Sequence, residues 1–175
     1  HPDNPVELLR VLRKNLPPNL KIAADAGGRF KPEELKVLIK MEEYHLDFLQ
    51  DPFAPDTPDE VYDELNELLP NTPICLGKQF KDAEALRQAA DKELCQVACL
   101  IPSRLGGIQV TRQLARWMQQ EGFSAWMGSE CETGIGTTAG LHLACLAAFD
   151  EPADSPPSFR WFEDELIRPW VKIRS

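Results

Sequence analysis

Hydrophobic and polar positions recur in a fixed order along this chain. A short apolar run ends in a small or polar cluster, a helical pattern follows, and the order returns about every 25 residues. Strands that alternate with helices in this way form βαβ units and a parallel sheet. The polar clusters mark the expected ligand site, because the carboxyl ends of parallel strands form it in such folds. They are residues 25–28, 50–52, 77–79, 101–104 and 128–130.

The same pattern predicts where the elements lie. Gly122 is expected to end one helix in a left-handed conformation, and Thr57 is expected to cap the start of another. Strands are predicted at residues 20–24, 46–49, 73–76, 95–101 and 123–128. Helices are predicted at residues 5–15, 32–44, 58–70, 82–92 and 107–120, and a last one follows the turn at residues 134–138 and reaches about residue 148.

These elements predict an α/β fold. Five strands with helical crossovers fit either an open doubly wound sheet or part of a (β/α)8 barrel. A complete barrel typically needs about 250 residues, so a chain of 175 residues predicts a partial TIM-type barrel. Residues 1–150 carry the barrel units, and residues 151–175, rich in proline and aromatic side chains, are expected to form a covering segment of the same domain.

Charge and composition exclude several function classes. The formal net charge of −9 disfavours a nucleic-acid or anionic-membrane partner, and no apolar run reaches the length of a membrane span. No secretory signal opens the chain, and the absence of an initiator Met predicts a processed or excised chain. Five cysteines make an odd count without a second metal-binding pair, so we expect structural thiols in the cytoplasm. Cys75, Cys99 and Cys131 are expected in or beside buried strands.

Five segments in order resemble the barrel of the enolase superfamily, in particular its mandelate racemase and muconate lactonizing branch. The resemblance places them at the third to seventh strands of that barrel, followed by a matching segment at Arg160–Leu166. Each motif alone is weak, but five at the right spacing make a strong match. The segments are Ile22–Gly28, Leu46–Phe53, Pro73–Lys78, Cys99–Gly107 and Trp126–Gly136.

The resemblance implies a shared partial reaction. In this superfamily a base removes the proton beside a carboxylate, and Mg²⁺ stabilises the resulting enolate. Mg²⁺ prefers hard oxygen ligands, which the family supplies as three carboxylates on successive strand ends. Lysines on the second and sixth strands act as acid and base. No segment of this sequence matches the second strand or the amino-terminal capping domain.

Position by position, the resemblance implies a depleted site. Asp25 matches the first metal ligand, but Gln50 stands at the second position, where a neutral amide binds Mg²⁺ less well. Gly77 replaces the third ligand, and Ile101 replaces the lysine of the sixth strand. We therefore expect Mg²⁺ binding to be weak or absent.

Neighbouring residues offer partial replacements. Lys78 is the candidate catalytic residue, because its ammonium can bring positive charge to the barrel mouth, although a solvated loop lysine is the simpler interpretation. Asp51 is a candidate ligand-binding residue, with capping or turn duty as the alternative. Further candidate ligand-binding residues are Ser103, Arg104, Glu130 and Glu132, and the two glutamates with Asp25 could form a displaced cation site.

Two further features concern the last predicted helix and the turn before it. The turn at residues 134–138 precedes a helix, so its amides suit an anion, and close packing of the helix against a strand is the alternative. His142 lies among leucines and is expected to be a packed helix residue.

Two functions follow from these patterns. One is a divergent barrel that has kept the fold and is impaired in enolate-forming chemistry, with a small carboxylate as its ligand. The alternative is an active isomerase or lyase that uses displaced residues or parts outside this chain. An open barrel edge exposes unpaired strand groups, so we expect self-association or a missing amino-terminal part.

Overall fold

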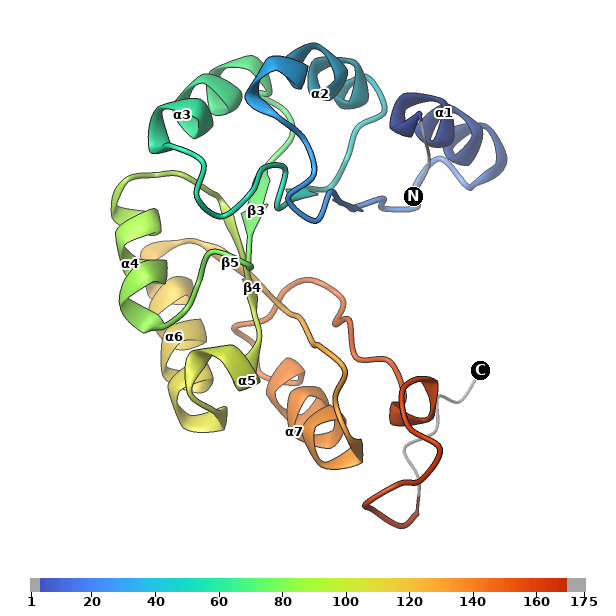
Figure 1. The fold of residues 1–175 in the computed structure, drawn as a ribbon, viewed down its shortest axis with the longest axis vertical. Helices are drawn as coiled ribbons and strands as arrows, with labels where there is room; N and C mark the ends of the chain where they lie inside the picture. Colours follow the sequence, from blue (N-terminus) through green and yellow to red (C-terminus); the bar gives the residue numbers. More distant parts are fainter. Residues whose placement is uncertain (1–3, 170–175) are drawn as a thin grey trace. The chain divides into compact units, whose positions relative to one another are not determined.

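The computed structural model describes residues 4–169, in which helices alternate with short parallel strands (Figure 1). The strands are β1 (Ala24–Asp25), β2 (Leu49–Gln50), β3 (Ile74–Leu76), β4 (Val97–Leu100) and β5 (Ser124–Met127). The α-helices are α1 (Pro5–Asn15), α2 (Leu35–Glu42), α3 (Asp59–Leu68), α4 (Ala83–Asp91), α5 (Pro102–Leu105), α6 (Ile108–Glu121) and α7 (Gly134–Ala144). Two short 3₁₀ helices are η1 (Pro32–Glu34) and η2 (Ser158–Arg160).

The chain divides into two compact units. The first comprises the residues up to Gln79 together with Ala89–Gln96, and the second comprises Phe80–Gln88 and the residues from Val97 onward. Helix α4 is shared between them. Across residues 4–169, no helix combines the length and the apolar character that crossing a membrane requires.

The first unit contains three parallel strands in chain order. Asp25 of β1 is level with Gln50 of β2, and Gln50 is level with Cys75 of β3. Because the strands are parallel, their carboxyl ends meet at one edge, which places the predicted Asp25 and Gln50 side by side in register. Leu49, Ile74 and Leu76 are at most 1% exposed and form the core beside these strands.

The first strand is shorter than predicted. The sequence pattern places a strand at residues 20–24, whereas the regular ladder covers only Ala24–Asp25. The pairing nevertheless begins earlier, because Asp47 N–H donates to the Ile22 carbonyl at 2.8 Å. The apolar pattern locates the strand, but the twist and partner geometry decide where regular pairing begins.

Helix ends follow local capping rules. Asn4 accepts the Glu7 amide at 3.1 Å and caps α1, while α3 starts after Pro58 instead of after the predicted cap Thr57. Gly122 ends α6 with a φ of 80°, as its position in the sequence predicts. Tyr62 and Leu65 on the inner face of α3 are buried, as its helical periodicity requires.

The second unit is built on the parallel pair β4–β5. Val97–Leu100 pairs residue by residue with Ser124–Met127, and all four β4 residues are buried. Helix α6 buries Thr111, Leu114, Ala115 and Met118 along one stripe. The helical stripe and the strand pair together form the core of this unit.

The segment after α7 returns along β5. Asp150 N–H donates to the Ala125 carbonyl at 3.3 Å, and Asp154 N–H donates to the Met127 carbonyl at 2.9 Å. The pairing remains irregular because Pro152 has no N–H to donate and Pro156 and Pro157 follow. The predicted covering segment therefore begins with a strand-like stretch beside β5.

Candidate functional site

In the first unit, Asp25 lies at the end of β1 and supports the turn that follows. Its Oδ1 accepts the Gly27 amide at 2.8 Å, and the Asp25 side chain is exposed. Gly27 and Gly28 have φ angles of 65° and 76°, which favour glycine. A Cβ on Gly28 would also lie 3.1 Å from the Phe53 carbonyl oxygen. One oxygen of Asp25 therefore stabilises a turn that requires these glycines.

Gln50 is level with Asp25 but differs from it in burial and charge. Gln50 is 7% exposed, and its side-chain Oε1 accepts a hydrogen bond from the Cys75 thiol at 3.5 Å. The neutral amide is thus engaged within the first unit, between β2 and β3.

Asp51 is buried and bonded to the backbone. It is 1% exposed with a φ of 41°, and its Oδ1 accepts the amides of Gly77 at 2.9 Å and Lys78 at 3.2 Å. Burial raises the pKa of Asp51 above its ordinary value, while hydrogen bonds from Gly77 and Lys78 oppose that rise. The carboxylate therefore closes the turn after β3.

Lys78 links two strand ends within the first unit. Its Nζ donates to the Gly27 carbonyl at 2.9 Å, while its own amide bonds to Asp51. The side chain is exposed, so its charge lies at the solvent-facing edge of the site. Asp25, Gln50, Asp51 and Lys78 are thus brought together by the ends of three neighbouring strands.

The donor set in the first unit does not fit Mg²⁺. Asp25 offers one carboxylate, Gln50 an amide, and Gly77 no side chain, whereas the ion prefers several hard oxygen ligands. Among residues 4–169, no three His, Cys, Asp or Glu side chains are grouped closely enough to hold a metal ion. We therefore assign no reaction step to Mg²⁺ here.

In the second unit, four predicted residues form two pairs. Ser103 Oγ donates to Glu132 Oε1 at 2.9 Å, and Arg104 Nε donates to Glu130 Oε1 at 2.5 Å. Ser103 and Arg104 lie on α5, while both glutamates follow β5. The structure thus joins residues that are more than 25 positions apart in the sequence.

Ile101 follows β4 and is buried at 8% exposure. A Cβ added to Gly128 would lie 3.0 Å from Ile101 Cγ1 and 2.3 Å from Cys99 Sγ. The position that the resemblance assigns to a lysine is therefore a tightly packed apolar site, and Ile101 can neither give nor take a proton.

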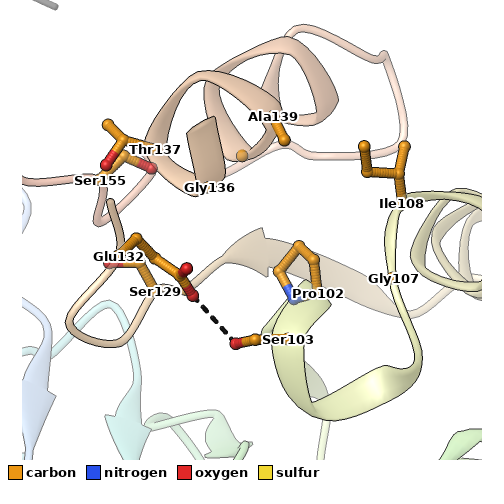
Figure 2. Close-up of a pocket in the computed structure, with 12 residues that line it drawn as sticks. Pro102, Ser103, Gly107, Ile108, Ser129, Glu132, Gly136, Thr137, Ala139 and Ser155 are labelled. Atoms are coloured by element: carbon orange, nitrogen blue, oxygen red, sulfur yellow. Dashed lines mark hydrogen bonds between the residues drawn. The ribbon is translucent and has the colours of Figure 1, made fainter. Parts of the chain in front are cut away.

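A cavity of about 310 Å³ opens beside Glu132 in the second unit (Figure 2). Small side chains from α5, the start of α6, the loop after β5, and α7 line it. Four residues contribute hydroxyl groups, namely Ser103, Ser129, Thr137 and Ser155. Ser155 was not a candidate from the sequence, since it lies in a proline-rich stretch without periodicity.

A larger open cavity of about 780 Å³ adjoins the first one, and both include Ser103, Ser129 and Glu132. Charged groups of both signs line its remaining wall, together with Trp161. The charged residues are Glu130, Asp154 and Arg160.

The start of α7 is bonded to a carboxylate of the same unit. Glu165 Oε1 accepts the Gly134 amide at 2.9 Å. A Cβ at Gly136 would lie 2.3 Å from Glu132 Oε2, so glycine is needed for Glu132 to rest against the first turn. The turn at residues 134–138, for which anion binding and close packing were the two alternatives, is therefore flanked by two carboxylates of the protein.

Two sequence expectations about burial were wrong. Cys131 is exposed in the loop that follows β5, and His142 is exposed on α7. The expectation of burial holds for Cys75 and Cys99. Cys95 is buried as well, and burial raises the pKa of its thiol to about 12.

Comparison with known proteins identifies the fold. The family model described as enolase C-terminal domain-like matches residues 1–175. A solved structure of an enolase superfamily member from Enterococcus faecalis superposes with a TM-score of 0.89 at 26% identity, covering 99% of this chain and 46% of that chain. These matches agree with the five strands and confirm a partial (β/α)8 barrel.

Two relatives with similar sequences are named as enzymes. An N-succinylamino acid racemase of Thermus thermophilus is 30% identical over 161 residues, which are 92% of this chain and 43% of the relative. An o-succinylbenzoate synthase of Bacillus subtilis is 26% identical over 174 residues, which are 98% of this chain and 46% of the relative. The chain therefore spans less than half the length of these relatives.

Proposed function

The chain belongs to the enolase C-terminal domain-like family, and from this we propose that it is a divergent barrel impaired in enolate-forming chemistry. In this proposal the first unit binds a small carboxylate through the charge of Lys78. Mg²⁺ takes no part, because the residues at the family's ligand positions do not suit it.

The hydrogen bonds of Asp51 carry the proposal. Asp51 is the acid closest to the altered positions Gln50 and Gly77, so it is the natural replacement for a lost metal ligand. Its Oδ1 instead accepts the amides of Gly77 and Lys78, and the side chain is 1% exposed. Turning it toward an ion would leave two backbone N–H groups without their acceptor, which costs about 1–3 kcal/mol for each buried donor.

Loss of proton transfer is supported in the second unit. Ile101 is packed against Gly128 and has no ionisable group. A positioned general base contributes about 10² to 10⁴ in rate, so its absence alone predicts very slow proton abstraction.

Ligand chemistry is supported by the position of Lys78. An ammonium near the ends of β1 and β3 attracts an anion without requiring a metal. The relatives are named for succinylated compounds, which carry carboxylates. A small mono- or dicarboxylate is therefore the proposed ligand class.

The alternative is an active isomerase or lyase that acts on the proton beside a carboxylate. It is favoured by the names of the relatives, and by the share of their length that lies beyond this chain. Under this alternative, displaced residues or additional chain would supply the acid and the base.

Proton exchange separates the two functions. An N-succinylamino acid is incubated with the chain and Mg²⁺ in D₂O, and loss of the Cα–H signal is followed by NMR. We expect no exchange above the protein-free control, while the Thermus racemase serves as the positive control. Rapid exchange catalysed by this chain would contradict the proposal and establish the alternative.

A further inference from the structure

We propose that residues 159–167 form a strap that detaches from the start of α7 while the rest of the second unit stays folded, and that its detachment widens the cavity of about 780 Å³. The strap lies in the segment after α7 (red in Figure 1). It is attached at two places, through the buried residues Pro157 and Ser158 before it and through Glu165 within it. The proposal concerns a movement within one unit, and it does not rest on the carboxylate ligand proposed above.

The chain before the strap is fixed to the body of the second unit. Asp154 N–H donates to the Met127 carbonyl of β5 at 2.9 Å, and Thr137 Oγ1 donates to the Pro156 carbonyl at 3.5 Å. Ser158, which follows, is buried. None of these contacts involves the strap, so this attachment can stay in place as the pivot about which the strap moves.

The strap itself buries little apolar surface. Its four large apolar side chains are each at least 40% exposed, so moving them away from the unit uncovers little more. The amides of residues 160–162 donate to carbonyls of Pro157 and Ser158, at the pivot end of the same turn, so these bonds survive the movement. The far attachment therefore contributes a large part of the free energy that opposes detachment. The four side chains are Phe159, Trp161, Phe162 and Leu166.

Glu165 holds the far end of the strap against α7. Its Oε1 accepts the Gly134 amide at 2.9 Å and the Leu166 amide at 2.7 Å. The fit is close, because a Cβ on Gly134 would lie 2.5 Å from this oxygen and 2.6 Å from Ile167 Cγ1. A charge-assisted hydrogen bond of this kind is small compared with the free energy that keeps a domain folded. The link can therefore open by a local fluctuation, without unfolding of the unit.

The strap forms part of the wall of the larger cavity. Arg160 and Trp161 of the strap line it together with Ser103 of α5 and the loop residues 129–132. Ser103 and this loop follow β4 and β5, and the carboxyl ends of strands form the ligand sites of parallel barrels. Detachment removes Arg160 and Trp161 from the wall, so it gives larger molecules access to these strand ends.

Two exposed cysteines of the second unit provide the test. Cys131 lines the larger cavity, whereas Cys145 follows α7 and lies outside that lining. Both thiols are labelled with iodoacetamide, which is small, and with a bulky maleimide that carries a polyethylene glycol chain. Mass spectrometry of the peptides gives the labelling rates. The measured quantity is the rate at Cys131 divided by the rate at Cys145, for each reagent.

Breaking the link from either side should widen the entrance. Glu165→Ala removes the acceptor, and Gly134→Ala places a Cβ against the strap. We expect each change to raise the Cys131 ratio for the bulky reagent about threefold or more, and the ratio for iodoacetamide less. The double variant should show no further increase, because both changes break the same link. Glu163→Ala in the strap and Gly140→Ala in α7 are the matched controls and should leave both ratios unchanged.

Hydrogen exchange of the unmodified chain shows whether the strap moves alone. The Gly134 amide reports the link to Glu165, the Thr137 amide reports the first turn of α7, and the Gly128 amide, bonded to a β4 carbonyl, reports the strand pair. We expect Gly134 to be protected at least about tenfold less than the other two, through an opening that urea does not promote.

Three results would overturn the proposal. The first is exchange of Thr137 or Gly128 together with Gly134 in the unmodified chain, which would mean that the helix frays or the unit unfolds. The second is an unchanged Cys131 ratio for the bulky reagent in both link variants. The third is loss of protection at Gly128 in either link variant, because the strap would then not be separable from the strand pair.

Discussion

Asp51 Oδ1 accepts the backbone N–H of Gly77 at 2.9 Å, within the first unit and away from solvent. This bond joins the residue after β2 to the residue after β3. The bond stabilises the turn after β3, where Gly77 has no side chain to do so. Asp51 is therefore a structural carboxylate.

Replacing Asp51 should destabilise the fold. Asp51→Ala removes the acceptor of two amides and should lower the free energy of unfolding by about 2 kcal/mol, while Asp51→Asn keeps one acceptor and should cost less. Urea denaturation of both variants measures this order. Equal stability of Asp51→Ala and the unmodified chain would contradict the structural role.

The stability difference should also depend on pH. Burial raises the pKa of Asp51, so the folded chain binds its proton more tightly than the unfolded chain does. The contribution of this group to stability is therefore full below the unfolded pKa and falls as pH rises through the folded pKa. The stability of Asp51→Asn relative to the unmodified chain should accordingly increase with pH, as urea titrations from acid to neutral pH would show. A difference that does not change with pH would contradict this assignment.

Restoring acids should restore Mg²⁺ binding. The double variant Gln50→Glu, Gly77→Asp would place three carboxylates at the ends of β1, β2 and β3, and should bind Mg²⁺ at least about tenfold more tightly than the unmodified chain. Calorimetry measures the affinity. The exposed pair Gln88→Glu, Gln113→Glu adds the same charge elsewhere and should have no such effect. Tight Mg²⁺ binding by the unmodified chain would overturn the proposed function.

Lys78 should control carboxylate binding without controlling stability. Lys78→Met should weaken succinate binding about tenfold or more, because the ammonium is lost, and change the melting temperature by less than about 2 °C, because the side chain is exposed. Calorimetry and thermal unfolding give the two values. Lys81→Met, also at an exposed position, is the control. Unaltered succinate affinity in Lys78→Met would exclude this residue.

Two glycines should respond oppositely to alanine. Gly128→Ala places a Cβ 2.3 Å from Cys99 Sγ and should destabilise the fold by about 1–3 kcal/mol. Gly140→Ala, within α7, meets Ser155 Oγ only at 3.6 Å, so it should be neutral or stabilise by up to about 1 kcal/mol. Urea unfolding of both variants tests the packing. Similar losses of stability in both variants would contradict the closer packing at Gly128.

Local patterns predicted the helices well, because periodic apolar positions and caps such as Gly122 act over a few residues. They could not predict that Asp51 turns back to the amide of Gly77, since this depends on how two strand ends meet. The pairing of Ser103 with Glu132 is similarly invisible before the strands are in register. The exposure of Cys131 was not predicted, because outside a helix or strand no periodicity indicates whether a side chain faces the core or the solvent.

The return of residues 150–154 along β5 has a consequence for chain truncation. Asp150 and Asp154 donate to carbonyls that would otherwise project from the free margin of β5. A chain ending after α7 would leave the edge of β5 unpaired. Unpaired strand edges can pair with the same edge of another molecule and so lead to oligomers or fibres. Residues 150–154 therefore satisfy carbonyl groups of β5 that truncation after α7 would expose.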